Sequence, residues 1–450
     1  MSHDTARTSS PRIGLLVLIV GATAGVAAVA LRWDVPTRAA IIAAVCIVLW
    51  IGELVPMWVP TVLLWLATPL LLATSSAAFT VIHVVGWSVD PVLGLFLGGF
   101  ALAAAATAQG VDRMVAALAI RLSRGRPIRL VVMAAVATLL LSMWMSNVAA
   151  AALMIASLRP VLDGDDSPSG SLRRPLLLAI ALAADIGGIA TPVGTGANGI
   201  AMAALEPTHP ISFIQWMVFG VPLAVGLLSA ALLIVIWRTR PTGTVHQTEL
   251  TPTPVTAATW WLGGVFGLTV LLWLSEPLHG VRSWIVALGA VLVLLVTRLI
   301  GWREVRAMDW STLLLIAGGI ALGALLERSG LVRVGATYVP LGGLPPFLSL
   351  LLLCLISALL SAVMSNTATA ALLIPLALTL DPAPSTAIIV AVSASLGIPF
   401  AISTPPNAMA VGTGMLSSRE LLLPGMVLLL GGCVLIALTG PTVLGAFGIP

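Results

Sequence analysis

Residues 141–153 read LSMWMSNVAAAAL, and residues 360–372 read LSAVMSNTATAAL. The second stretch repeats the first in the other half of the chain, and both place a Ser-Asn pair inside an apolar run. Further matches follow in the same order: GGFAL at 98–102 with GGIAL at 318–322, and GTGAN at 194–198 with STPPN at 403–407. Ordered self-similarity of this kind predicts two structural repeats, which we place at 13–237 and 258–450.

The composition of the chain around these stretches excludes a soluble fold. Of its 450 residues, 59% are hydrophobic and only 8% are charged, whereas soluble chains carry about 25% charged residues. Apolar runs such as Ile13–Leu31 and Ile211–Trp237 approach or exceed the roughly 20 residues that a helix needs to cross a bilayer. We therefore expect an all-α polytopic membrane protein. Its net charge of +4 is explained by basic cytoplasmic loops, so no nucleic-acid partner is expected.

The arginines predict the side of the membrane to which each Ser-Asn segment opens. Arginines flank the first segment on both sides: Arg113, Arg121, Arg124, Arg126, Arg129, Arg159, Arg173 and Arg174. Basic residues mark the cytoplasm, so we expect a re-entrant helical hairpin at about 128–162, entered from the cytoplasm, with Ser146 and Asn147 at its tip. No arginine lies between Arg333 and Arg419. The second hairpin, at about 347–380, should therefore open on the opposite side, which makes the two repeats inverted.

The same distribution of arginines places the remaining segments. We expect residues 1–12 to form a cytoplasmic N-terminal tail and the polar, Thr- and Pro-rich stretch 238–257 to form a cytoplasmic linker between the repeats. The last helix is expected at about 420–445.

Each hairpin is followed by an apolar segment that carries helix-breaking residues, TPVGTGAN at 191–198 and STPPN at 403–407. Proline lacks a backbone donor and glycine tolerates open geometry, so we expect unwound transmembrane helices at about 175–206 and 385–415. Irregular backbone at membrane depth occurs where it lines a cavity or is buried in protein. Helix N-termini at the breaks attract anions, while freed carbonyls and side-chain oxygens can coordinate a small cation. The pattern predicts adjoining anion and cation sites.

The hairpin-tip Ser-Asn-Thr, the GGIATPVGT stretch at 187–195 and the Thr-Pro-Pro-Asn break resemble motifs of the divalent-anion:sodium symporter (DASS) family, of the bacterial sodium/dicarboxylate-sulfate transporter type. Members carry dicarboxylates, citrate or sulfate, and they either couple to sodium or exchange anions. The resemblance implies an elevator-type transporter in the cell (inner) membrane. It further implies a homodimer in which each protomer has a scaffold domain and a moving transport domain.

Carried over by motif, the resemblance implies substrate contacts at Ser146, Asn147, Val148, Thr195, Ser365, Asn366, Thr367, Thr404 and Pro405. It implies a first sodium site at Ser142, Ser146, Asn147 and the carbonyl of Gly194. It implies a second at Ser361, Asn366 and the carbonyls of Met364 and Ser403. Sodium is the only metal implied, and no organic cofactor is expected.

The sequence departs from the family pattern at three places. Val148 stands where a hydroxyl is expected at the first tip, and TGAN replaces TPPN at the first break. Asp185 is an ionisable residue at membrane depth, which by default indicates a functional role. We expect it to help hold a cation near Asn147 or to titrate as a proton-coupling group. The alternative is a protonated or hydrogen-bonded carboxyl that only packs between helices.

Several functions fit this pattern. The leading one is sodium-coupled uptake of a C4-dicarboxylate such as succinate, malate or fumarate. The alternatives are anion exchange, or sodium- or proton-coupled transport of citrate, sulfate or arsenite. An enzyme is not expected, because the five histidines show no metal-ligand spacing and no paired intramembrane carboxylates are present. Polar breaks in two inverted halves favour alternating access over a channel.

Overall fold

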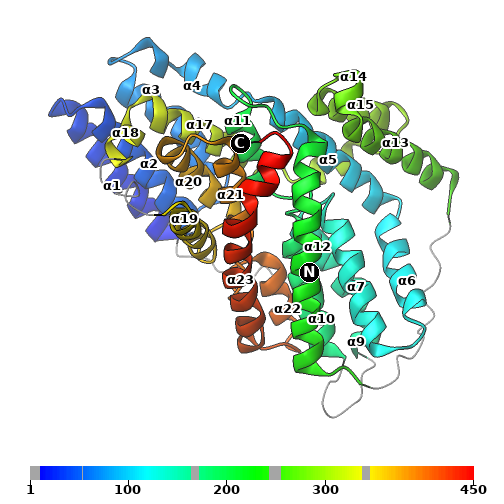
Figure 1. Ribbon diagram of the computed structural model, residues 1–450. Helices are drawn as coiled ribbons and strands as arrows, with labels where there is room; N and C mark the ends of the chain where they lie inside the picture. The colour runs from blue at the N-terminus through cyan, green and yellow to red at the C-terminus, as the bar shows by residue number, and fades with distance from the viewer. Residues whose placement is uncertain (1–10, 53, 164–171, 243–254, 337–344, 450) are drawn as a thin grey trace.

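The computed structural model describes residues 11–52, 54–163, 172–242, 255–336 and 345–449. Most of the expected tail at 1–12 and of the expected linker at 238–257 therefore lies outside the described residues. Within them, helices are joined by short turns and no strand is present. Figure 1 shows a broad assembly of helices, with α1 to α3 at one side and α13 to α15 at the other.

The first half begins with helices that precede the first Ser-Asn segment. They are α1 (Pro11–Ala30), α2 (Val35–Ile51), α3 (Val59–Leu72), the 3-10 turn η1 (Ala77–Phe79), α4 (Val81–Trp87), α5 (Pro91–Ala108) and α6 (Val111–Ser123). The hairpin follows as α7 (Pro127–Ser142) and α8 (Asn147–Ser157), with the short α9 (Arg159–Asp163) behind it. The broken segment comprises α10 (Arg173–Gly187) and α11 (Gly196–Leu205), and α12 (Phe213–Thr239) ends this half.

The second half has a similar order of elements. It begins with α13 (Ala257–Leu274), α14 (Glu276–His279), α15 (Ser283–Val296), α16 (Trp302–Ala307), α17 (Trp310–Arg328) and α18 (Leu331–Ala336). The hairpin comprises α19 (Pro346–Ser361) and α20 (Asn366–Leu380), and the broken segment comprises α21 (Pro384–Ala394) and α22 (Pro405–Gly412). The chain ends in α23 (Ser418–Ala446).

The chain is a multi-pass membrane protein. Among the described residues, six helices are long and apolar enough to cross a bilayer: α1, α5, α12, α13, α17 and α23. The hairpin helices are shorter; α7 has 16 residues and α8 has 11. Each falls below the roughly 20 residues that a crossing needs, as α2, α3 and α10 also do.

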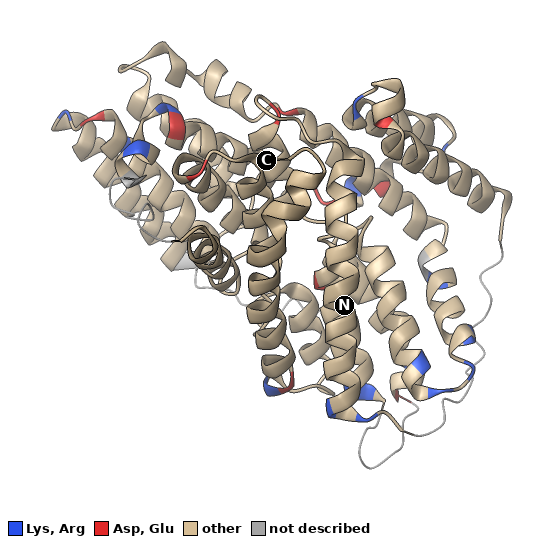
Figure 2. Ribbon diagram, in the orientation of Figure 1, with Lys and Arg blue, Asp and Glu red and all other residues tan. Residues whose placement is uncertain are grey.

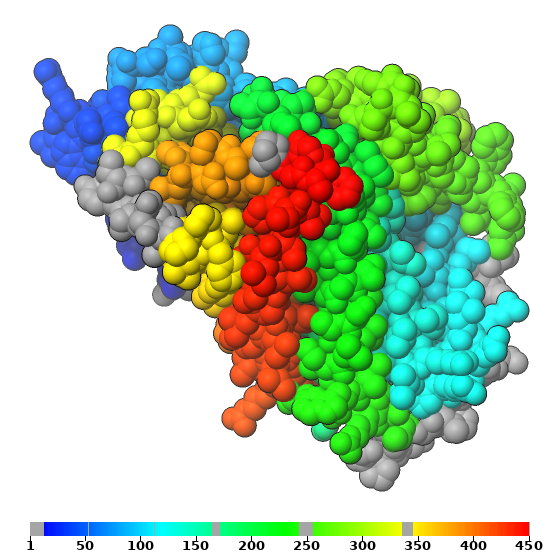
Figure 3. Space-filling view, viewed as in Figure 1, coloured from blue at the N-terminus to red at the C-terminus, as the bar shows by residue number. Residues whose placement is uncertain are grey.

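The two broken segments form the centre of the molecule. All side chains from Pro175 to Gly187 in α10 and from Ser385 to Ala394 in α21 are buried. These helices are rich in alanine, leucine and isoleucine, so neighbouring helices approach them closely. The long helices α12 and α23 cover them, and Figure 3 shows these two side by side along one face.

Arginines gather at one end of the assembly. Figure 2 shows blue at the lower ends of α6, α7, α12 and α23. Arg121 and Arg124 lie at the end of α6, Arg238 lies in the last turn of α12, and Arg419 opens α23. The first hairpin has its base at this charged end, because α7 begins directly after Arg126.

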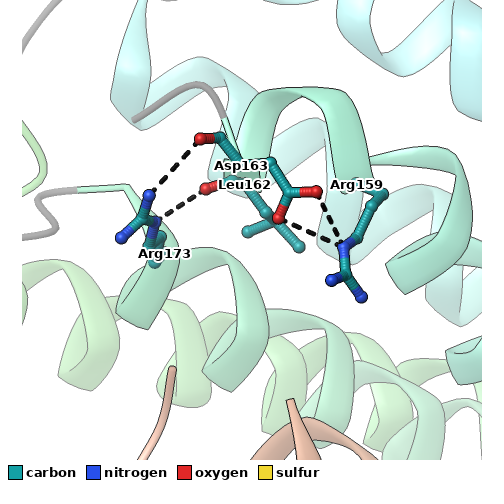
Figure 4. Close-up of polar contacts among 4 residues, drawn as sticks. All are labelled: Arg159, Leu162, Asp163 and Arg173. Carbon is teal, nitrogen blue, oxygen red and sulfur yellow. Dashed lines mark hydrogen bonds and ion pairs between the residues drawn. The ribbon is translucent and has the colours of Figure 1, made fainter. Parts of the chain in front are cut away.

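The base of the first hairpin is fixed to α10 by polar contacts (Figure 4). The guanidinium of Arg173 donates to the carbonyl of Leu162 at 2.7 Å. Arg159 pairs with Asp163 at 2.9 Å within α9. The Arg173 contact joins the start of the broken helix to α9, which follows the hairpin.

Candidate functional site

Four short helices begin at a serine or threonine that belongs to the predicted motifs. Ser146 caps α8, Thr195 caps α11, Ser365 caps α20 and Thr404 caps α22. Each hydroxyl accepts a hydrogen bond from a backbone N–H of its own first turn, at distances from 3.2 to 3.4 Å. Such caps fix the helix starts, and they leave each hydroxyl proton free to donate elsewhere.

The free hydroxyl protons distinguish one cap from the other three. Ser146, Thr195 and Ser365 are half-buried, and within the described part of the chain they donate no hydrogen bond. Thr404 is buried and donates to Asp185 Oδ2 at 2.9 Å. Three caps thus present donors at helix N-termini, where anions bind favourably.

Both hairpin tips contain the same internal hydrogen bond. The Ser142 hydroxyl donates to Asn147 Oδ1 at 2.8 Å, and the Ser361 hydroxyl donates to Asn366 Oδ1 at 2.7 Å. Each bond links the last residue of one hairpin helix to the first residue of the other. The predicted Ser-Asn pairs therefore lie at the tips, and their side-chain oxygens cluster there.

The first tip lies directly against the first break. A Cβ atom on Gly188 would lie 2.7 Å from Asn147 Oδ1 and 3.1 Å from the carbonyl oxygen of Gly194. Glycine is therefore needed at 188 for this close approach. The structure thus brings together Ser142, Asn147 and the Gly194 carbonyl, three of the groups predicted for the first sodium site.

Each hairpin packs against the broken helix of the other half. The hairpin helix α20 packs on α11 of the first half, while α8 packs on α22 of the second. A Cβ atom on Gly196 would lie 2.5 Å from the Thr367 hydroxyl oxygen, so Thr367 lies at the N-terminus of α11 beside Thr195. Met364 and Ser403, predicted for the second sodium site, are buried in the turn before α20 and in the second break.

Two predicted substrate residues are more peripheral. The Val148 side chain is 41% exposed, whereas Thr367 at the matching place of the second tip is 8% exposed. Pro405 begins α22 and is exposed as well. Neither residue makes a polar side-chain contact, so their contribution to a site is limited to shape.

Two buried asparagines hold the breaks open. Both belong to the matched sequence motifs, but the sequence alone predicts no role for them. Asn198 Nδ2 donates to the carbonyls of Gly188 and Thr191 at 2.9 and 2.8 Å. In the second half, Asn407 Nδ2 donates to the carbonyls of Ile398 and Phe400 at 2.7 and 3.2 Å. Carbonyls freed by unwinding must be satisfied inside the protein, and these amides satisfy them. The sequence signal that could have indicated this role is the asparagine that ends both matched motifs.

A cavity of about 480 Å³ leads to the first tip. Its lining includes Met145 and Ser146 from the tip region, Phe100 from α5, and Arg303, Glu304 and Asp309 around α16. The place of Arg303 beside the tip depends on tertiary packing. Most of its lining is apolar, and Arg303, Glu304 and Asp309 are the charged residues of the cavity.

The comparisons with known proteins agree with this architecture. The family model described as "Citrate transporter" (CitMHS) matches residues 47–387. This chain belongs to that family. The resemblance to the divalent-anion:sodium symporters is thereby confirmed.

Relatives and a solved structure extend the likeness along the chain. An "Uncharacterized transporter" of Haemophilus influenzae is 32% identical over 418 residues, covering 87% of this chain and 88% of the relative. The sodium-dependent dicarboxylate transporter SdcS of Staphylococcus saprophyticus is 26% identical, covering 82% and 80%. The YdaH transporter of Alcanivorax borkumensis has a similar fold, with a TM-score of 0.56, 20% identity and coverage of 82% and 88%. The chain is therefore a membrane transporter, which supports the prediction that it is not an enzyme.

Proposed function

We propose that this family member is a secondary active transporter that takes up small dianions, C4-dicarboxylates such as succinate, malate or fumarate, together with sodium. The observation that carries the proposal is the set of three half-buried cap hydroxyls, Ser146, Thr195 and Ser365, which lie at helix N-termini with protons free to donate. They supply donors for carboxylate oxygens without a cationic side chain.

Sodium coupling is supported by the oxygens beside these donors. Side-chain oxygens of Ser142 and Asn147 and the carbonyl of Gly194 gather at the first tip, and Ser361 and Asn366 gather at the second. Neutral oxygens are ligands that hard cations accept. A relative in the same family is named a sodium-dependent dicarboxylate transporter.

The transport mechanism proposed here is alternating access. The two halves act as inverted repeats, with the site at their interface. The hairpins and broken helices form a transport domain that moves like an elevator against a scaffold, in a homodimer within the cell membrane. The arginine-rich end in Figure 2 faces the cytoplasm, and the N-terminus lies on the same side.

The experiment that tests this function is uptake of labelled succinate by proteoliposomes. Vesicles are prepared with or without an inward sodium gradient, and with either no anion or unlabelled succinate inside. Sodium-driven accumulation in anion-free vesicles is the expected result. Uptake that needs internal succinate would replace symport by exchange. Uptake of citrate, sulfate or arsenite but not succinate would refute the C4-dicarboxylate assignment. Protein-free vesicles are the control.

A further inference from the structure

Asp185 is a buried carboxylate that lies outside the groups proposed above to bind the anion and sodium. It lies near the end of α10 and is 1% exposed. Its Oδ2 atom accepts the hydrogen bond from Thr404, whereas its Oδ1 atom is buried and has no hydrogen-bond partner among the described residues. Because α10 belongs to the first half and Thr404 to the second, this carboxylate lies where the halves meet.

A buried carboxylate that is ionised requires a partner. Buried charges in proteins are paired with opposite charges or bound to metal ions, because the cost of desolvation is otherwise too high. Within the part of the chain that the structure describes, Asp185 forms no ion pair. One hydroxyl donor does not compensate a full negative charge, so the free oxygen points to a cationic ligand.

The neighbouring groups are oxygens, the ligand type that suits a hard cation. The Ser142 hydroxyl lies 2.6 Å from the carbonyl oxygen of Ala184, the residue preceding Asp185, and 2.8 Å from Asn147 Oδ1. On the other side, Asn407 contacts Thr404 through its backbone N–H, and its Oδ1 atom is also buried without a hydrogen-bond partner. The Asp185 carboxylate thus contacts Thr404 of the second break, and the residue before it in α10 contacts Ser142 of the first tip.

We propose that Asp185 is the charged ligand of a sodium site shared by the two halves, a site that the family motifs do not contain. This inference deepens the proposed function, on which it rests for the identity of the cation. The remaining ligands come from the neutral oxygens around Asp185, with Thr404 as the link to the second half.

A charge at Asp185 also affects the neighbouring helix N-terminus. Thr404 caps α22, one of the helix N-termini assigned to the substrate. Without a cation, the carboxylate of Asp185 repels an anion that approaches this N-terminus. With sodium bound, the repulsion is removed and the N-terminus attracts the anion. A sodium ion at Asp185 and an anion at this N-terminus should therefore favour each other's binding.

The test measures binding of sodium alone to the purified full-length protein, without any anion. Radioactive sodium binding is titrated at constant ionic strength with choline chloride as the balancing salt. Relative to wild type, Asp185→Asn should bind one fewer sodium ion per chain or should weaken sodium binding at least about tenfold, since it removes the ligand charge. Glu276→Gln is the matched control: Glu276 is also buried and is hydrogen-bonded to Ser283, and its replacement should leave sodium binding unchanged.

A second variant covers the case in which Asp185→Asn does not fold. Asp185→Ser copies the residue at the matching place of the second broken helix, Ser395, which lies two residues before Gly397 as Asp185 lies two before Gly187. It should show the same loss of sodium binding. Wild-type protein that binds no sodium would overturn the proposal, and so would either folded variant with unchanged sodium binding. A variant that keeps its sodium binding but loses the pH dependence of uptake would assign Asp185 to protons instead. Because the binding titrations contain no anion, a wrong substrate assignment cannot change their results; only the pH dependence of uptake depends on the substrate.

Discussion

The two hairpin tips share one construction and differ in one side chain. In both, a serine hydroxyl bonds to an asparagine oxygen, and a second serine caps the following helix. The next residue is Val148 in the first tip, which is 41% exposed, and Thr367 in the second, which lies against Gly196 of the other half. The common part is suited to binding small ions, while the difference makes the second tip the more polar contact for a substrate.

The two breaks show a second asymmetry. Thr404 of the second break is bonded to Asp185, whereas Thr195 of the first break keeps its hydroxyl proton free. The fixed negative charge therefore lies on one side of the site only. The two similar halves therefore differ in chemistry. The second break contacts a charge suited to a cation, and the first break offers a hydroxyl donor suited to an anion.

The largest effect is expected from removing the common part of the tips. Asn147→Ala and Asn366→Ala should each reduce uptake to background, because each asparagine is assigned to both ions. Uptake in proteoliposomes checks this, with size-exclusion chromatography as the control for folding. Retained uptake in both variants would refute the site.

The asparagines of the breaks should behave differently from those of the tips. Asn198→Ala leaves two buried carbonyls without donors, so we expect a loss of about 2–3 kcal/mol of stability, at about 1–1.5 kcal/mol for each hydrogen bond. Asn407→Ala should lose a similar amount of stability. Thermal unfolding in detergent measures the difference, and the tip variants should unfold close to wild type. Equal unfolding temperatures for both classes would contradict the assigned roles.

Exchanging the third residue of the tips tests their asymmetry. Thr367→Val should raise the KM for the anion about five- to tenfold, the effect of losing one hydrogen bond of about 1 kcal/mol or slightly more. Val148→Thr adds a hydroxyl at an exposed position and should lower the KM or leave it unchanged. Initial rates of uptake measure both. A larger effect at 148 than at 367 would reverse the comparison.

The smallest effect is expected at the charged end, away from the tips. Arg174 pairs with Glu420 at 3.2 Å, and the arginine side chain is 57% exposed. Exposed ion pairs contribute about 0–1 kcal/mol, so Arg174→Ala should change stability by no more than that and should leave the KM unchanged. Thermal unfolding in low and high salt is the measurement. A loss of uptake would show that this end takes part in binding.

Much of this arrangement could be predicted from the sequence, because it depends on local patterns. The apolar run at 13–31 became α1, and the expected hairpin at about 347–380 corresponds to α19 and α20 at 346–380. The Ser and Thr caps followed from residues adjacent to helix starts. The first hairpin ends earlier than expected, at Ser157, and α9 follows it.

Contacts between distant segments could not be predicted in this way. No local pattern indicates that Asp185 meets Thr404, or that Arg303 lines a cavity beside Ser146. The burial of Thr367 and the exposure of Val148 likewise depend on the packing of α20 against α11. Periodicity and motif spacing describe each half by itself, whereas these contacts arise where the halves meet.

Sodium and the anion are proposed to bind together where the two halves meet. The most direct test is calorimetric titration of purified protein with succinate at several sodium concentrations, with choline replacing sodium. We expect succinate affinity to rise with sodium, and sodium affinity to rise by the same factor with succinate, because coupling between two binding sites is reciprocal. Succinate binding that is the same in sodium and in choline would contradict the account.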